Sequence, residues 1–232
     1  MEAEGETDGG GESQYGMSIT VPIPAADNDL YRYEATDGVL RILADNPYEE
    51  FTIRELSRFV GYSHPAISNA VGVLESNALV TVSAEGNRKH VSIDRNRLTK
   101  PDDPVLRIPQ SEFHAPVRTA LDRLQDELAD VVGILVFGSV ARGEADRQSD
   151  IDLWVLVQSD RATNQRRANE IGTDLTETRF AGDRYEFQIL VESARSALNV
   201  SDRLTDVLAS SITLYETETL RRFKREVRSD AE

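Results

Sequence analysis

The feature that most constrains the fold is an apolar run of seven residues, Val131–Phe137, that leads directly into Gly138-Ser139. Such a run, closed by a glycine corner, predicts a strand that is buried on both faces. After ten intervening positions, Asp150-Ile-Asp152 opens a second apolar run, Leu153–Val157. An amphipathic helix, with apolar residues at 117, 121, 124 and 128, precedes the first strand. The pattern therefore predicts a short mixed sheet flanked by helices.

The residues at the end of the first strand and the start of the second predict a phosphate and metal site. Gly138 lets the backbone turn sharply and approach a ligand, because it has no Cβ. Ser139 offers a hydroxyl and free backbone N–H groups at a strand-to-helix corner. Asp150 and Asp152, two apart on a strand, point to the same side. Two such carboxylates repel each other and are stable as anions beside a hard cation such as Mg²⁺.

This spacing resembles the signature of the nucleotidyltransferase superfamily, and the stretch from Phe137 to Glu144 is most similar to its minimal members. The resemblance implies transfer of a nucleoside monophosphate from a nucleoside triphosphate, expected to be ATP, with two Mg²⁺ ions. It also implies metal binding by Asp150 and Asp152, and phosphate contacts from Gly138, Ser139 and Arg142. The expected acceptor is a protein or an RNA, because minimal members often act as antitoxins.

The same resemblance implies a third carboxylate on a later strand, residues 184–191. Glu186 is the best match there, as a catalytic and metal-binding residue, because it lies between two apolar neighbours. Asp183 is a weaker substitute. If the register of the strand instead places Gln188 beside the two aspartates, the triad is broken.

Residues 35–98 resemble a winged helix-turn-helix domain. A short apolar helix near 39–43 is followed by Thr52-Ile-Arg-Glu55, which has capping-box spacing, and Gly61 can close the helix that this box starts. Ser63 can cap a third helix with a buried stripe at 67, 71, 74 and 78, and two strand-like pieces follow. The sequence thus predicts an α+β protein of two domains.

In that family the third helix and the hairpin contact double-stranded DNA. The residues carried over to this sequence are Ser63, His64, Ser68, Asn69, Arg88 and Lys89, with Arg54 and Arg58 nearby. The third helix has no Arg or Lys, so a winged helix that serves only dimerisation or protein contact is the alternative. Such modules commonly pair, and a homodimer is expected.

Charge and composition exclude several other classes of protein. No apolar run is long enough for a membrane span, and the absence of cysteine excludes disulfides and cysteine zinc sites. The net charge of −15 argues against casual nucleic-acid binding. Because its bases are almost all arginine, the acidic chain fits a salt-rich cytoplasm, although a GC-rich coding bias explains the arginines equally well. The polar, acidic N-terminus is unlike a secretory signal, so a cytoplasmic location is expected.

The expected organisation has five parts. They are an acidic mobile tail with a possible edge strand (1–34), the winged helix (35–98), a Pro-rich linker (99–116), the nucleotidyltransferase domain (117–219) and a basic C-terminal helix (220–232). The alternative function is a transcriptional regulator whose second domain only senses nucleotide. A dual role as autoregulator and transferase is compatible with the same residues.

Overall fold

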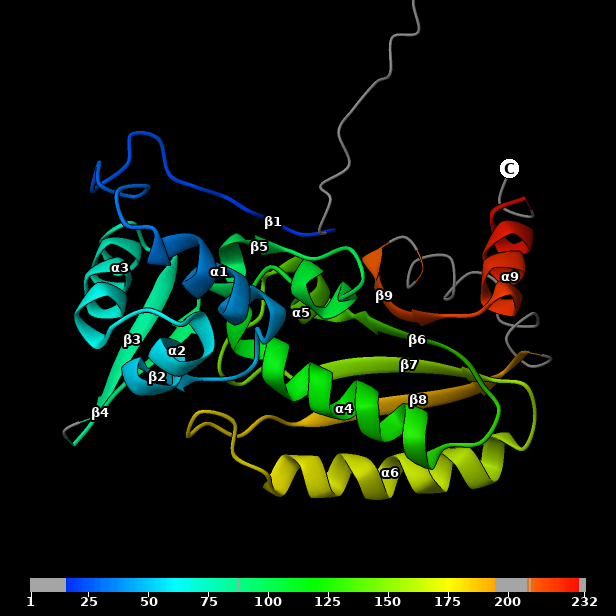
Figure 1. Ribbon diagram of the computed structural model, residues 1–232. Helices are drawn as coiled ribbons and strands as arrows, with labels where there is room; N and C mark the ends of the chain where they lie inside the picture. The colour runs from blue at the N-terminus through cyan, green and yellow to red at the C-terminus, as the bar shows by residue number, and fades with distance from the viewer. Residues whose placement is uncertain (1–15, 87, 195–207, 209, 230–232) are drawn as a thin grey trace, which may run out of the picture. The chain divides into compact units, whose positions relative to one another are not determined.

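The computed structural model describes residues 16–86, 88–194, 208 and 210–229. The chain divides into two compact units, Met1–Asp102 and Asp103–Glu232. Both combine helices with sheet, so the chain is of mixed α and β class (Figure 1). Most of the expected acidic tail, residues 1–15, lies outside the described residues, as do residues 230–232.

From residue 16 onward, with residue 87 left aside, the first unit contains three helices and a small antiparallel sheet. The helices are α1 (Ala35–Asp45), α2 (Ile53–Val60) and α3 (His64–Ser76). The sheet has the order β2-β4-β3, with β2 at Phe51–Thr52, β3 at Val80–Glu85 and β4 at Arg88–Ile93. A 3-10 turn at Arg95–Arg97 leads into β5 (Leu98–Thr99), which pairs with β1 (Ser18–Ile19).

Local sequence signals set the ends of α2. The backbone N–H of Glu55 donates to the Thr52 hydroxyl at 3.3 Å, and the Glu55 carboxylate accepts from the Thr52 backbone at 2.8 Å. This reciprocal pair satisfies donors that a helix start leaves free, and it confirms the predicted capping box. Gly61 ends α2 in the left-handed conformation, with φ +83°, as the sequence predicts.

The expected strand at residues 18–24 is shorter than its alternating pattern suggests. The strand covers Ser18–Ile19, antiparallel to Leu98–Thr99, and the Thr20 N–H adds one more bond to the Arg97 carbonyl oxygen at 2.8 Å. Beyond this point Ile23 is 96% exposed, and the prolines at 22 and 24 each lack the backbone donor that a ladder requires. The edge pairing therefore stops before the first of them.

The second unit is built on a four-stranded sheet of order β8-β7-β6-β9. Its strands are β6 (Val131–Phe137), β7 (Ile151–Val157), β8 (Phe187–Ser193) and β9 (Ile212–Glu216). The pair β7–β8 is parallel, and the other two pairs are antiparallel. The helices of its described residues are α4 (His114–Glu127), α5 (Gly138–Arg142), α6 (Arg161–Glu177) and α9 (Glu218–Ser229).

One face of this sheet packs on α9. Trp154 of β7 stacks on Phe223 of α9 with the ring centroids 6.3 Å apart, and Leu220 fills the space above Gly133, where any β-carbon would overlap it. Trp154 is only 1% exposed. It is thus part of the core, as the sequence suggests, and it lies two positions after Asp152 on the same strand.

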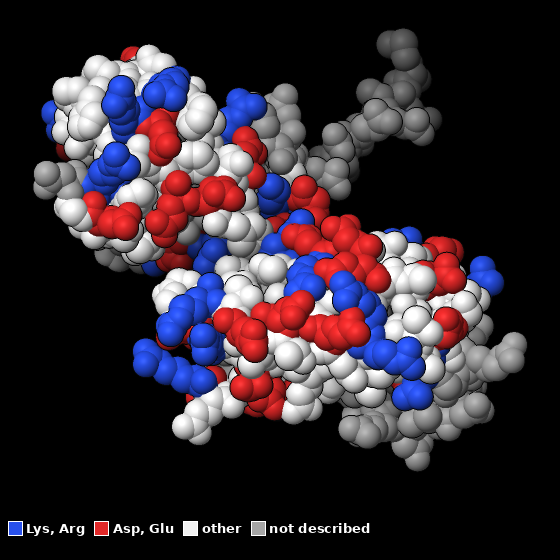
Figure 2. All heavy atoms as spheres, turned by 90° about the horizontal axis from the view of Figure 1, so that it is seen from below, with Lys and Arg blue, Asp and Glu red and all other residues white. Residues whose placement is uncertain are grey.

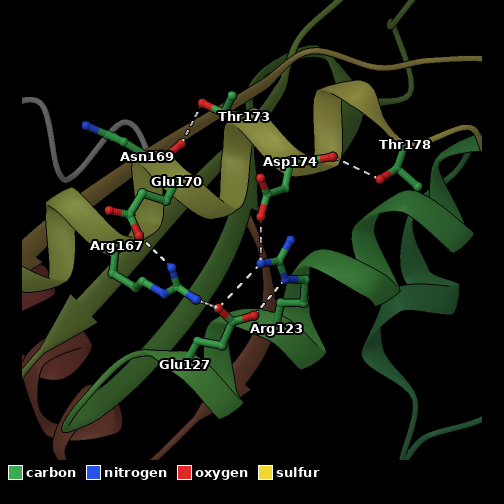
Figure 3. A network of polar contacts seen from close by, with 8 residues as sticks. All are labelled: Arg123, Glu127, Arg167, Asn169, Glu170, Thr173, Asp174 and Thr178. Atoms are coloured by element: carbon green, nitrogen blue, oxygen red, sulfur yellow. Dashed lines mark hydrogen bonds and ion pairs between the residues drawn. The ribbon is translucent and has the colours of Figure 1, made fainter.

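Helices α4 and α6 are tied together by a charged network (Figure 3). The Glu127 carboxylate accepts from Arg123 at 2.7 Å and also pairs with Arg167, while Arg123 reaches Asp174 at 3.1 Å. Hydrogen bonding from Arg123 is the main cause that lowers the pKa of Glu127.

In Figure 2, acidic and basic side chains interleave over the face drawn, as expected where ion pairs form locally.

The Pro-rich segment 99–116 differs from the expected linker. Two 3-10 turns, Pro104–Arg107 and Ser111–Phe113, lie within it. Val105, Ile108 and Phe113 are buried, and the buried His114 Nε2 lies 2.7 Å from the Ile108 carbonyl oxygen. The segment from residue 103 onward therefore packs as part of the second unit, because its apolar residues between the prolines join the core.

The basic run on α9 is largely neutralised by neighbouring acids. Lys224 pairs with Glu216 at 2.6 Å, and Arg221 pairs with the same carboxylate at 2.9 Å. Arg225 reaches Glu218 at 3.2 Å. Among the described residues, no helix has the length and apolar character that crossing a membrane requires.

Candidate active site

The corner between β6 and α5 brings Gly138 against Asp152. Phe137 pairs with Asp152 across the antiparallel β6–β7 ladder, so the following residue turns back over the carboxylate. Gly138 has φ +71°, and a β-carbon there would overlap Asp152 Oδ2. Only glycine meets both requirements without strain. The sequence pattern thus reflects a close approach between a backbone corner and a carboxylate.

Asp150 and Asp152 form a pair of half-buried carboxylates at this corner. Burial, and then the charge of Asp150, raise the pKa of Asp152, while Arg142 acts in the opposite direction. A divalent cation would relieve both causes, since it replaces lost solvation and offsets the repulsion. Oxygen ligands of this kind suit Mg²⁺, so the residues present fit the ion that the sequence implies.

Two further predicted residues lie at the same corner. Ser139 is half-buried in the first turn of α5, and its carbonyl oxygen accepts from the Glu144 backbone at 2.9 Å. Arg142 is exposed at the end of α5, and its Nε donates to Glu144 at 2.8 Å. Since Arg142 affects the pKa of Asp152, its charge lies within range of the aspartate pair.

The loop from Gly143 to Asp150 is held in shape by side-chain bonds. Asp146 accepts from the Gln148 backbone at 2.9 Å and from the Ser149 hydroxyl at 3.0 Å, and these bonds lower its pKa. Gln110 adds a two-point clamp, because its amide donates to the Ala145 carbonyl at 2.8 Å and accepts from the Ala145 N–H at 3.1 Å. Sequence reasoning missed Gln110, since nothing near it in the chain marks the contact.

On β8 the side chain that meets the aspartates is Gln188. The parallel ladder places Gln188 opposite Asp152, and the Gln188 amide donates to Asp150 Oδ2 at 2.5 Å. Within the described part of the chain, no group of three or more His, Cys, Asp or Glu residues is arranged to hold a metal. The structure therefore brings together two carboxylates and one carboxamide.

The two acidic candidates for the third position are exposed, and within the described residues neither completes an acidic cluster with the aspartates. Glu186 lines a cavity of ≈ 420 Å³ with Thr176 and Glu177 of α6, and a second cavity with Arg147, Gln148 and Ser149 of the loop before Asp150. Its carbonyl oxygen accepts from the Ile151 N–H at 2.8 Å, so the backbone, not the carboxylate, joins β7. Asp183 is exposed in a turn, where its backbone pairs with that of Phe180.

In the first unit, predicted DNA-binding residues line a hollow of ≈ 640 Å³. His64 and Ser68 of α3 and Arg88 and Lys89 of β4 take part, and α2 adds basic side chains at 54 and 58. Ser63, the N-cap of α3, and Asn69 are exposed but do not line it. The hollow thus gathers four Arg or Lys side chains from α2 and the hairpin.

Comparison with known protein families identifies the second unit by class. Residues 117–200 match the model described as nucleotidyltransferase domain. The match spans both aspartates and the glycine corner, and it indicates an enzyme of the nucleotidyltransferase class. No curated protein matches the sequence.

Solved structures that resemble the chain include a tri-AMPylated HEPN toxin in complex with its MNT antitoxin from Shewanella oneidensis. That match has 17% identity, covers 50% of this chain and 84% of the other, and has a TM-score of 0.37. A toxin–antitoxin complex with AMP-PNP matches at 25% identity over 49% of this chain and 85% of the other, with a TM-score of 0.38. A homodimeric winged helix-turn-helix domain from Mycobacterium bovis matches at 16% identity over 44% and 80%, with a TM-score of 0.25. Scores this low carry no argument about function, which rests on the domain match and the site geometry.

Proposed function

We propose that the second unit transfers a nucleoside monophosphate from ATP to an acceptor and releases pyrophosphate. The observation that carries the proposal is the close approach of Gly138 to the Asp152 carboxylate. A backbone corner of this kind suits phosphate, and the carboxylate pair beside it suits a metal ion. The domain match over residues 117–200 supports the same reaction class.

Each residue at the corner has a role in this proposal. Asp150 and Asp152 would hold Mg²⁺, which would supply positive charge to neutralise the phosphates. Gly138 lets the backbone approach the triphosphate, and Ser139 donates its hydroxyl and N–H to phosphate oxygens. Arg142 adds a positive charge at the rim. The proposal gives Glu186 no metal role, because within the described residues no third acidic side chain joins the aspartate pair.

The test of this assignment is the double variant Asp150→Asn with Asp152→Asn. Full-length protein is incubated with labelled ATP, Mg²⁺ and a cell extract as acceptor source, and pyrophosphate and labelled product are measured. The variant should lose transfer while its circular dichroism spectrum stays native, since asparagine keeps the shape and removes the charge. Transfer at the wild-type rate by the folded double variant would refute the assignment.

A protein or RNA acceptor is proposed because the stretch Phe137–Glu144 is most similar to the minimal members of the superfamily. The two classes separate in one experiment. Label that disappears after protease treatment belongs to a protein, and label that disappears after ribonuclease treatment belongs to an RNA. Label that survives both treatments would count against a macromolecular acceptor.

For the first unit we propose binding to double-stranded DNA as a winged helix, with a homodimer as the binding form. The basic hollow at α2, α3 and β4 supports this role, because Arg and Lys side chains neutralise phosphates.

In the rival proposal the protein is a transcriptional regulator whose second unit senses nucleotide without turning it over. It predicts an ATP-dependent change in operator affinity with no pyrophosphate formed, so the pyrophosphate assay decides between them.

A further inference from the structure

Gln188 is the β8 side chain that lies beside the aspartate pair. Its backbone lies opposite Asp152 in the parallel ladder, and its side-chain amide reaches Asp150 Oδ2 at 2.5 Å. On the two central strands, the positions next to Asp152 are Phe137, its partner on β6, and the buried Trp154 on β7. Neither has a side-chain oxygen that could bind a cation. Gln188 is therefore the side chain of the edge strand that meets the carboxylates.

The contact has a specific chemical consequence for a metal ion. The Gln188 amide now donates a hydrogen bond to an Asp150 oxygen that a cation would use. An incoming cation repels that N–H group. If the carboxamide of Gln188 rotates by half a turn, its carbonyl oxygen takes the place of the NH₂ group and faces the cation. Amide carbonyl oxygens are accepted ligands of hard divalent cations. The same side chain can therefore hold Asp150 in place before the ion arrives and bind the ion afterwards.

The charge of this set limits how many ions it can hold. Two carboxylates and one neutral amide carry two negative charges, and Arg142 lies close enough to affect Asp152. Without the triphosphate, a second divalent ion at the corner would thus lack a compensating carboxylate. We propose that Gln188 is the third oxygen ligand of a site that, in the absence of nucleotide, holds a single divalent cation, in place of the third carboxylate expected from the sequence. This inference rests on the proposed function of Asp150 and Asp152.

The test titrates MnCl₂ alone into the full chain and follows free Mn²⁺ by electron paramagnetic resonance. Wild type should bind one ion. Gln188→Leu, which removes the oxygen, should bind it about tenfold more weakly, as expected when a residue that supports a metal site is lost. Gln188→Glu, which adds a carboxylate, should bind more tightly or take up a second ion. Gln148→Glu adds the same charge in the loop before Asp150 and should leave the binding unchanged, which excludes a general charge effect.

The outcomes separate this inference from the proposed function. If wild type binds Mn²⁺ and Asp150→Asn abolishes binding, but Gln188→Leu binds as wild type does, Gln188 is no ligand and only this inference fails. Two ions bound by wild type would overturn it as well. If wild type and Asp150→Asn show the same lack of binding, the metal site itself is wrong, and both proposals fail together.

Discussion

The Asp152 carboxylate lies in the space that a β-carbon on residue 138 would need, so any side chain at position 138 would have to displace that carboxylate. This relationship joins the two halves of the sequence signature, which are separated by more than ten positions along the chain. It also makes a direct prediction, because the glycine is required for two independent reasons: its positive φ and the contact.

Gly138→Ala is expected to lower transferase activity by more than tenfold, because Asp152 has to move away from the new methyl group. The left-handed backbone at this position, φ +71°, adds roughly 1–2 kcal/mol of strain for a residue with a Cβ. Gly182→Ala is the matched control, since Gly182 has φ +97° but open space around it. Both variants should lose similar stability in urea unfolding, while only Gly138→Ala loses activity. Equal activity of the two variants would show that the contact does not matter.

Asp152 should make the protein less stable as the pH rises. Burial raises its pKa in the folded state, so the folded state binds the proton more tightly than the unfolded chain, where the pKa is about 3.9. The folded state therefore loses stability as the pH rises from that value through the raised pKa. Asp152→Asn should have a higher unfolding temperature than wild type at pH 7.5, and the difference should vanish near pH 3.5.

Mg²⁺ should reverse this difference. The ion stabilises whichever folded state binds it, so added MgCl₂ should raise the unfolding temperature of wild type and leave Asp152→Asn unchanged. Chelation with EDTA should return wild type to its metal-free value. An equal response of both proteins to MgCl₂ would contradict the assignment of Asp152 as a ligand.

Gln110 should contribute to stability and activity through the loop that carries Asp150. Gln110→Ala removes both hydrogen bonds to Ala145, each worth about 1 kcal/mol net, so a loss of about 1–2 kcal/mol is expected in urea unfolding. Because the loop then loses its anchor, the Mn²⁺ affinity should fall as well. Gln148→Ala is the control, since Gln148 is exposed in the same loop and its backbone bond to Asp146 remains. Full Mn²⁺ affinity in Gln110→Ala would confine the clamp to a structural role.

The sequence predicted those parts of the structure that short-range signals determine. Thr52 and Glu55 are three residues apart, and their capping box forms as expected because both partners belong to one helix end. The glycine corner and the start of the second strand were found for a similar reason, since each adjoins a strand that is recognisable from its apolar run. Gly61 ends its helix through its own φ angle, with no help from distant residues.

The third position of the site could not be predicted in this way. Glu186 and Gln188 are two positions apart, so the alternation of the strand assigns both to the same face. Only the pairing of β8 with β7 fixes which of them contacts Asp150. β8 is an edge strand with a half-exposed face, where Leu190 is 39% exposed, so hydrophobicity specifies its register weakly. Gln110 is 35 residues from its partner Ala145, a separation at which a single sequence carries no signal.

The charged network between α4 and α6 should depend on pH in the opposite sense to Asp152. Hydrogen bonding from Arg123 lowers the pKa of Glu127, so the ionised carboxylate stabilises the fold above the unfolded pKa of about 4.3. This contribution is lost as the pH falls through the lowered, folded-state pKa. Glu127→Gln should therefore cost up to about 1 kcal/mol at pH 7 and progressively less as the pH falls through the folded-state pKa. Glu170→Gln, in the exposed pair with Arg167, should have a smaller effect at every pH.

DNA binding by the first unit should depend on the arginines and lysine that line its hollow, not on α3 alone. If Arg54, Arg58, Arg88 and Lys89 each neutralise one phosphate, then replacing any of them with alanine should reduce the slope of log K against log salt by about 1. Arg41→Ala is the matched control, because Arg41 lies on α1 and does not line the hollow. Fluorescence anisotropy on the promoter of the protein's own gene, measured across a salt series, gives both affinity and slope. Phosphate contacts carry no sequence information. The four variants should therefore weaken binding to the promoter and to random DNA alike, whereas Ser68→Ala should reduce only the preference for the promoter. A salt slope that stays the same in all four variants would show that the hollow does not bind the DNA backbone.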